Sequence, residues 1–241
     1  MLHRDLLFKN LLALLLIITI NRALGCGRRE QRKPDPASRR MTRSGAVVGF
    51  QEERYGGHAW LGIPFAKPPV GPLRWRAPQR PEQWIGTREA LAFGSACTQV
   101  GGLTGKGAPV GSEDCLYLNV YAPRFTEAQA PKAGARLPVM LWIYGGGNFT
   151  GDAGQYTGGN LAATHKLIVI TTNYRVGPFG WFRHAALRAD GADDLDRSGN
   201  FGTLDLLRAL QWIRENADPG DTIALWGRSI QNLLFFKSPL R

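Results

Sequence analysis

The chain has 241 residues, of which 44% are hydrophobic and 20% charged, a composition typical of a protein that folds around a sizeable core. Its formal net charge is +11, yet residues 1–43 alone hold ten of the 30 Lys and Arg against three of the 19 Asp and Glu. The basic excess is therefore mainly N-terminal, and no basic stripe interleaved with aromatic residues runs through the body of the chain. These features argue against nucleic acid as a partner.

The N-terminus has the layout of an export signal. Arg4 and Lys9 precede an apolar run from Leu11 to Ile20, and Ala-Leu-Gly-Cys follows at 23–26. The run is too short to span a bilayer and fits the apolar region of a secretory signal peptide. We therefore expect a signal peptide over residues 1–25 and an exported protein, whether secreted, periplasmic or lipid-anchored.

The small residues before Cys26 resemble the lipobox of bacterial lipoproteins, although Leu24 stands where a smaller residue is commoner. Cys26 is then a candidate for lipid attachment and hence for a membrane anchor. The alternative is an ordinary signal cleaved near Gly25, in which case Cys26 is incidental. If Cys97 and Cys115 pair, Cys26 is the one cysteine left over, and a disulfide fits an oxidising compartment.

Residues 26–43 are rich in Arg, Pro and Ser and almost free of apolar residues, which predicts a polar basic linker and a globular domain over 44–241. Apolar runs then predict buried strands. A proline-rich stretch at 66–81 excludes helix there. The expected strands cover residues 45–50, 60–65, 116–121, 137–144 and 167–174.

From Thr203 the apolar period becomes helical, and the helix is expected to end at Asn216 before Pro219 and Gly220. Its apolar face consists of Leu206, Leu207, Leu210 and Ile213, and its solvent side of Arg208, Arg214 and Glu215. Residues 222–226 read as one more short buried strand. Strand, helix and strand in that order predict an α/β fold with a right-handed βαβ unit in a mostly parallel sheet.

The strand expected at 137–144 runs directly into Gly145, Gly146 and Gly147. Glycine permits positive φ and lets backbone N–H groups approach a ligand without a Cβ in the way. Two such N–H groups at the end of a central strand can stabilise the oxyanion that forms in acyl transfer. The plainer alternative is a flexible turn after a core strand.

The last expected strand runs into Gly-Arg-Ser-Ile-Gln at 227–231. A serine on a sharp turn between strand and helix is the nucleophile elbow, whose usual pattern is G-x-S-x-G. Here Gln231 replaces the final glycine. The G-x-S pattern alone is weak, and an ordinary turn serine is commoner, but a position after a core strand and downstream of the glycine triplet favours Ser229 as a nucleophile.

Five further motifs follow one another along the chain: G-I-P-F-A-K-P-P-V-G-P-L-R-W at 62–75, S-E-D-C-L-Y-L-N-V-Y at 112–121, W-I-Y-G-G-G at 142–147, N-Y-R-V-G-P-F-G at 173–180, and G-N-F-G-T-L-D with A-L-Q-W-I within 199–213. In this order they resemble the type-B carboxylesterase family, which includes the cholinesterases and has the α/β-hydrolase fold. The resemblance covers residues 44 to about 226 and implies the N-terminal part of that fold, with a mostly parallel sheet, C-terminally truncated.

The resemblance implies a serine carboxylic ester hydrolase. Its nucleophile would be Ser229, which forms an acyl-enzyme that water then hydrolyses. The oxyanion hole would use Gly146, Gly147 and Ile230, and the family's first disulfide would join Cys97 and Cys115. The substrate would be a small-molecule ester, with no cofactor or metal. Residues 98–114 contain no aromatic side chain to hold a choline cation, so a general carboxylesterase fits better than a choline-specific one.

The chain also departs from the family. In this fold the acid and the histidine of the triad follow the serine, but the twelve residues after Ser229 contain no Asp, Glu or His. We expect His3, His58, His165 and His184, which all precede the serine, to be surface or local structural residues. Arg228 also stands where an acidic residue is usual. The chain is therefore expected to be inactive as it stands, either as a fragment or as the product of a decayed gene. The alternatives are a non-catalytic, adhesion-like binding relative, or a lipid-anchored scaffold that depends on Cys26; ester preference and oligomeric state stay open.

Overall fold

The computed structural model describes residues 32–101, 107–125 and 137–216, together with the backbone of residues 223–227. The chain divides into two compact units, Met1–Arg32 and Lys33–Arg241. The fold described below is that of the second unit.

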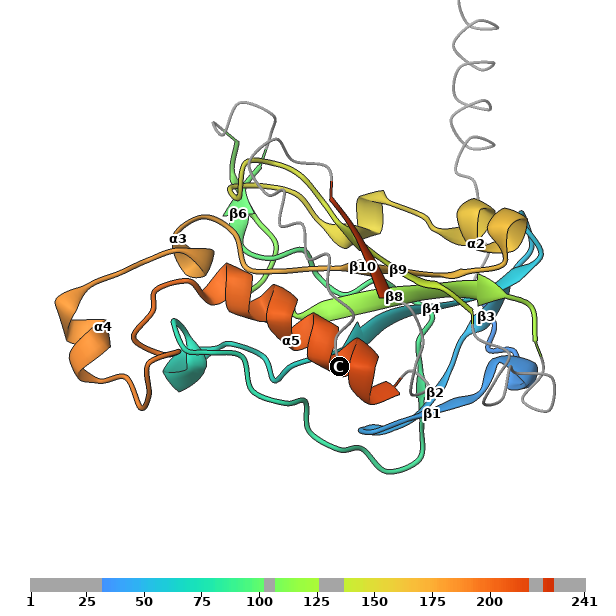
Figure 1. Cartoon of the computed structure of the whole chain (residues 1–241), viewed down its shortest axis with the longest axis horizontal. Helices are drawn as coiled ribbons and strands as arrows, with labels where there is room; N and C mark the ends of the chain where they lie inside the picture. The colour runs from blue at the N-terminus through green and yellow to red at the C-terminus, as the bar shows by residue number, and fades with distance from the viewer. Residues whose placement is uncertain (1–31, 102–106, 126–136, 217–222, 228–241) are drawn as a thin grey trace, which may run out of the picture. The chain divides into compact units, whose positions relative to one another are not determined.

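A six-stranded mixed sheet forms the centre of this unit (Figure 1). Its strand order is β11-β9-β10-β8-β4-β3, in which β9 is parallel to both β10 and β11, while the other neighbours are antiparallel. The expectation of a mostly parallel sheet therefore holds for three strands only. Strands β3 and β4 are joined by a short turn that permits only antiparallel pairing, and β8 is antiparallel to both of its neighbours. The strand bounds are β3 (Phe50–Glu52), β4 (Gly57–Pro64), β8 (Tyr117–Pro123), β9 (Val139–Ile143), β10 (Ile168–Thr172) and β11 (Ile223–Gly227).

Two smaller sheets flank the large one. One has the order β1-β2-β5, with β1 (Arg40–Thr42), β2 (Gly45–Val48) and β5 (Thr87–Glu89), and the other pairs β6 (Gln99–Val100) with β7 (Pro109–Val110). The second of these lies between Cys97 and Cys115, so the two arms of the disulfide loop pair as antiparallel strands near the bridge.

The globular unit begins about ten residues earlier than the sequence suggests. Residues 36–42, which we expected within a polar linker, form the 3-10 helix η1 (Pro36–Ser38) and strand β1, and Ser38 is 0% exposed. Its hydroxyl donates to Asp35 O at 2.6 Å and accepts from Gly49 N at 2.8 Å. The polar composition misled because these side chains bond to the backbone of the domain instead of to water.

Helices α2 (Gly159–His165) and α5 (Phe201–Asn216) lie on opposite faces of the large sheet (Figure 1). Alternate residues of β8 show this division: Leu118 belongs to the core under α5, and Tyr121 to the smaller core under α2. The remaining helical segments are short: α3 (Gly177–Gly180), α4 (Ala185–Ala189), η2 (Gly71–Leu73) and η3 (Ala153–Gln155).

Helix α5 forms where expected, but two of its side chains face the other way. Leu207, assigned to the apolar face, is 41% exposed, and Arg208, assigned to solvent, is 4% exposed. The Arg208 Nε donates to the buried carbonyl of Phe65 at 3.1 Å, and its guanidinium also reaches Glu215. A carbonyl that needs a donor thus overrides the hydrophobic period at this position.

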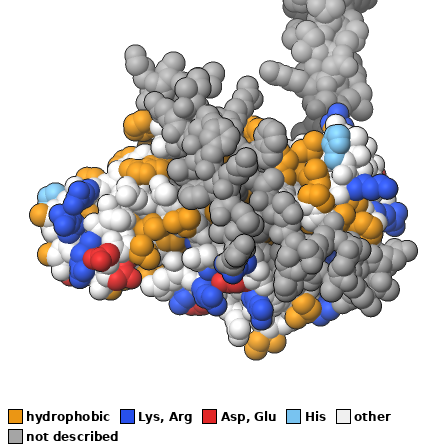
Figure 2. All heavy atoms as spheres, viewed as in Figure 1, with side chains coloured by type: hydrophobic (Ala, Val, Ile, Leu, Met, Phe, Trp, Pro, Cys, Tyr) orange, Lys and Arg blue, Asp and Glu red, His pale blue; other side chains and the backbone are white. Residues whose placement is uncertain are grey.

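No helix within the described ranges is both long and apolar enough to cross a membrane. On the face that Figure 2 shows, the Lys and Arg side chains of the described residues stand in separate groups among hydrophobic and uncharged atoms. On this face the basic charge of the described residues is therefore dispersed rather than gathered into one stripe.

Candidate active site

Strands β9 and β11 leave the sheet side by side at the same edge. They are parallel, with Trp226 opposite Trp142 and Gly227 opposite Ile143. Neighbouring strands lie about 4.8 Å apart, so the two chain segments that follow Ile143 and Gly227 start close together. The glycine triplet begins two residues after Ile143, and Ser229 comes two residues after Gly227.

The serine itself is not placed. Ser229 and Ile230 lie outside the described residues, as do Arg228 and Gln231, and Cys26 at the other end of the chain lies outside them too. What the structure does describe is the glycine half of the candidate site and the edge of the sheet to which both halves connect.

The glycine triplet forms a tight turn with positive φ at three consecutive residues: Gly146 (145°), Gly147 (62°) and Asn148 (67°). The carbonyl of Gly146 accepts from Phe149 N at 3.1 Å and from Thr150 N at 3.3 Å. A Cβ on Gly146 would collide with the carbonyl oxygen of Thr150, so only glycine fits. Among the described residues no acceptor takes the N–H of Gly146 or of Gly147.

A pair of tyrosines joins the ends of β9 and β10. Each hydroxyl donates to the other residue's backbone carbonyl at 2.9 Å, and the rings of Tyr144 and Tyr174 stack 4.4 Å apart. Burial raises the pKa of Tyr174 to about 12 and that of Tyr144 well above its usual value, so both hydroxyls keep their protons and continue to donate at neutral pH. The residue before the glycine triplet is thereby fixed to the neighbouring strand.

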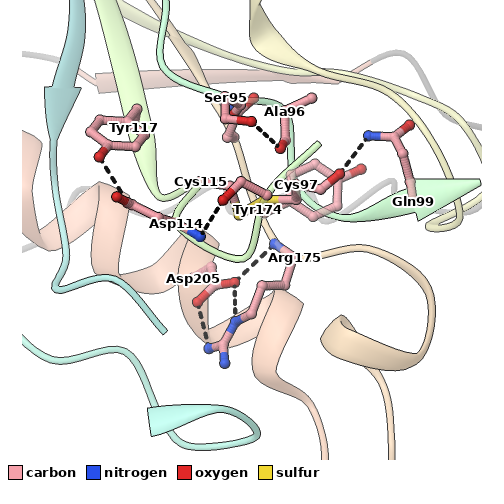
Figure 3. Close-up of a disulfide and its surroundings, with 12 residues drawn as sticks. Ser95, Ala96, Cys97, Gln99, Asp114, Cys115, Tyr117, Tyr174, Arg175 and Asp205 are labelled. Atoms are coloured by element: carbon pink, nitrogen blue, oxygen red, sulfur yellow. Dashed lines mark hydrogen bonds and ion pairs between the residues drawn. A yellow bond between two sulfur atoms is a disulfide. The ribbon is translucent and has the colours of Figure 1, made fainter. Parts of the chain in front are cut away.

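A buried ion pair joins the same edge to helix α5 (Figure 3). The Arg175 guanidinium donates twice to the Asp205 carboxylate, at 2.9 and 2.8 Å, and the Arg175 backbone N–H donates to it as well at 2.9 Å. The side chains are 4% and 0% exposed. Two charges so far from water are stable only as a pair, so this contact sets the position of α5 beneath the sheet edge.

The disulfide between Cys97 and Cys115 is present, with Cα atoms 4.9 Å apart, and lies at this edge just before β8 (Figure 3). Two residues beyond Cys97, the side chain of Gln99 bonds to Cys97 and to the turn after the glycine triplet. The sequence analysis missed Gln99. Its spacing of two residues from a bridged cysteine was the available signal, since residues i and i+2 of an extended segment share a face.

The described histidines lie away from this edge or make local contacts. His58 is buried at the start of β4, and because β4 runs in the same direction as β9, its start lies at the opposite edge of the sheet. Its Nε2 lies 3.0 Å from Asp35 Oδ2, and burial lowers its pKa, although Asp35 partly offsets this effect. His184 accepts from Ala186 N at the start of α4. In the described ranges, His, Cys, Asp and Glu form no group of three or more that could hold a metal ion.

Curated relatives are ester and acyl hydrolases by name. The chain is 44% identical over 185 residues to the fumonisin B1 esterase of Sphingopyxis macrogoltabida, which covers 76% of this chain and 32% of the relative. It is 41% identical over 198 residues to the para-nitrobenzyl esterase of Bacillus subtilis strain 168, covering 78% and 37% respectively. The chain thus spans about a third of the length of the curated relatives it matches.

Solved structures give the same result and confirm the α/β-hydrolase fold. A para-nitrobenzyl esterase structure superposes with a TM-score of 0.65 at 40% identity, covering 79% of this chain and 38% of that one. A carboxylesterase of Geobacillus stearothermophilus superposes with a TM-score of 0.64 at 35% identity, covering 79% and 37%. The family model described as the carboxylesterase family matches residues 36–229, and the chain therefore belongs to the carboxylesterase family.

Proposed function

We propose that this chain supplies the nucleophile and the oxyanion hole of a serine carboxylic ester hydrolase acting on small-molecule esters. The Ser229 hydroxyl would attack the ester carbonyl, the N–H groups of Gly146 and Gly147 would donate to the oxyanion together with that of Ile230, and an acyl-enzyme would form as the alcohol leaves. Water would then release the acid. The parallel register of β9 and β11, with Gly227 opposite Ile143, is the observation that carries this proposal.

We also propose that the 241-residue chain is inactive by itself, because it offers no base for Ser229. The proton of the Ser229 hydroxyl must pass to a base, and no Asp, Glu or His follows Ser229 in this sequence. His58 supplies none, because it lies at the opposite edge of the sheet in a pair with Asp35. Loss of the triad costs several orders of magnitude in rate, so the 241-residue chain alone would be inactive.

Two preparations test this proposal with 4-nitrophenyl acetate as substrate. The first is the 241-residue chain beside its Ser229→Ala variant, and we expect equal rates close to the buffer rate. The second is a hybrid that keeps this chain through Gln231 and continues it from there with the corresponding C-terminal region of the Bacillus subtilis esterase. The hybrid should hydrolyse the ester, and Ser229→Ala should abolish the activity. A soluble, folded hybrid without Ser229-dependent hydrolysis would contradict the proposal.

The alternative function is that of a non-catalytic, adhesion-like relative that binds a partner through the same fold. Gln231, which stands in the place of a small residue, and Arg228, which stands where an acidic residue is usual, favour this alternative over an active enzyme. The hybrid separates the two, because a site that has lost its catalytic geometry would stay inactive even when a relative supplies the missing groups.

Export and anchoring form a separate proposal. We infer that residues 1–25 direct export, and the disulfide supports this because such bonds persist in oxidising compartments. Mass spectrometry of the mature N-terminus tests it: a diacylglyceryl group on Cys26 indicates a lipid anchor, whereas cleavage near Gly25 with an unmodified Cys26 indicates a secreted or periplasmic protein. A retained Met1 in protein from the native host would contradict export.

A further inference from the structure

One side chain makes several hydrogen bonds to the turn that carries the two amide donors. Gln99, from the disulfide hairpin, uses its full hydrogen-bonding capacity, two donors and two acceptor positions, on four partners. Its Nε2 donates to Cys97 O and to Gly151 O, both at 2.9 Å. Its Oε1 accepts from Thr150 Oγ1 at 2.6 Å and from Gly151 N at 2.7 Å. Three of these four bonds go to the residues that close the turn.

Thr150 in turn helps to fix one of the donor amides, that of Gly147. Thr150 N and Phe149 N both donate to the carbonyl oxygen of Gly146. That C=O belongs to the same planar peptide unit as the N–H of Gly147, so the direction of one determines the direction of the other. A displacement of Thr150 would therefore rotate the Gly147 N–H, one of the two donors proposed for the oxyanion.

The turn needs such support because its own backbone offers little. Gly146 and Gly147 have the widest conformational choice of any residue, and Asn148 has a positive φ that costs energy for a residue with a Cβ. Gly177 N holds the far side of the turn by donating to Asn148 O at 2.6 Å. Gln99 is the corresponding support on the near side, at Thr150 and Gly151.

The position of Gln99 is itself anchored. The disulfide fixes Cys97 to Cys115, directly before β8, and the Gln99 side chain bonds back to the Cys97 carbonyl (Figure 3). Thr98 N donates to Ser112 O at 3.1 Å, which closes the base of the hairpin. A continuous path of covalent and hydrogen bonds thus runs from the disulfide through Gln99 to the peptide unit between Gly146 and Gly147.

From this path we propose that Gln99 is a positioning residue for the oxyanion hole, anchored by the Cys97–Cys115 disulfide. It touches no reacting atom and acts through Thr150 and Gly151 on the Gly147 N–H. The inference rests on the proposed function for its catalytic meaning. The structural part of the inference is that Gln99 controls the direction of the Gly147 N–H bond. This part can be tested without any measurement of activity.

The test compares three variants of the full 241-residue chain by amide NMR. Gln99→Leu removes all four bonds at similar volume, and Gln99→Glu keeps the acceptors but loses the donors while it is ionised. Gln155→Leu is the matched control, because this exposed glutamine lies in η3 near the turn but bonds to Asp152. The residual dipolar coupling of the Gly147 N–H reports the direction of that bond, and hydrogen exchange of Thr150 and Gly151 reports the closure of the turn.

We expect Gln99→Leu to change the Gly147 coupling and to raise exchange at Thr150 and Gly151 by about tenfold or more, while core amides such as those of Leu141 and Ala209 stay unchanged. Gln99→Glu should approach the wild-type values at pH 4, where protonation restores one donor, and depart from them at pH 7. Gln155→Leu should match the wild type. A Gly147 coupling that is unchanged in Gln99→Leu would overturn the inference.

The hybrid esterase adds the catalytic readout. There, Gln99→Leu should lower kcat about tenfold or more with KM within about twofold, because an oxyanion donor acts mainly in the transition state. Inactivity of the hybrid with Gln99 intact would contradict the proposed function but leave the NMR result standing. An active hybrid whose kcat is unaffected by Gln99→Leu would overturn the positioning role alone.

Discussion

Gly146 and Gly147 are adjacent, but each is glycine for a different physical reason. A Cβ on Gly146 meets the backbone oxygen of Thr150, whereas a Cβ on Gly147 has only Phe149 Cδ2 near it, at 3.8 Å. Gly147→Ala should therefore cost only the strain of its positive φ, about 1–2 kcal/mol of unfolding free energy. Gly146→Ala should cost more and shift the amide resonances of residues 147–151. Urea unfolding and amide spectra check both, and equal effects from the two variants would contradict the structure.

The buried ion pair between Arg175 and Asp205 makes a second prediction at the scale of single residues. Asp205→Asn leaves the guanidinium buried without its counter-charge and should cost about 3–5 kcal/mol of unfolding free energy. Asp190→Asn is the matched control, since Asp190 is also paired with an arginine, Arg76, but is 85% exposed and should contribute little. Urea midpoints of the two variants measure the difference. A loss below about 1 kcal/mol for Asp205→Asn would show that the pair does not hold α5.

At the scale of elements, helix α5 carries a carboxylate in its last turn, where the helix dipole disfavours negative charge. Glu215 lies in the last turn, where negative charge meets unpaired carbonyls, yet the hydrogen bond from Arg208, aided by its charge, lowers the Glu215 pKa despite partial burial. A carboxyl with a lowered folded pKa stabilises the fold above its unfolded pKa and loses this contribution as pH falls through the folded value. Glu215→Gln should thus cost about 1 kcal/mol at pH 7.

The same variant should approach the wild-type stability below the folded pKa of Glu215, since both side chains are then neutral. Urea midpoints measured in steps from pH 7 down to pH 2 follow this convergence. A difference between Glu215→Gln and the wild type that stays constant across this range would show that the ion pair with Arg208 does not contribute. The contact with Arg80 is expected to matter less, because the Arg80 side chain is 76% exposed.

The sequence predicted the elements that apolar burial determines, and it failed for polar side chains whose hydrogen-bond partners lie far away in the sequence. Buried strands such as β9 and β10 follow from apolar runs, and α5 from its period, because burial alone determines them. Arg208 and Ser38 were assigned to solvent because their partners, Phe65 O and Gly49 N, come from distant parts of the chain. Gln99 was missed for the same reason. The glycine turn was predictable, since it needs a backbone that only glycine allows.

At the scale of the whole molecule, the N-terminal boundary of the globular unit has a measurable consequence. In the structure the second compact unit begins at Lys33, whereas the composition of the sequence predicts that the globular domain begins at residue 44. Residues between these limits bond to the domain: Ser38 O accepts from Trp60 Nε1 at 2.8 Å, Asp35 Oδ2 lies 3.0 Å from His58 Nε2, and Arg40 Nη2 donates to Phe125 O at 2.7 Å. The two boundaries therefore predict different results when the chain is shortened.

A chain that starts at Lys33 should unfold at the same urea midpoint as the 241-residue chain, because the contacts above all survive. A chain that starts at Ser44 should lose several kcal/mol, since it leaves the buried His58 Nε2, Trp60 Nε1 and Gly49 N–H groups without partners, at about 1–3 kcal/mol each. Ser38→Ala in the longer chain isolates one of these losses and should fall between the two. Equal midpoints for both shortened chains would show that residues 33–43 are a linker after all.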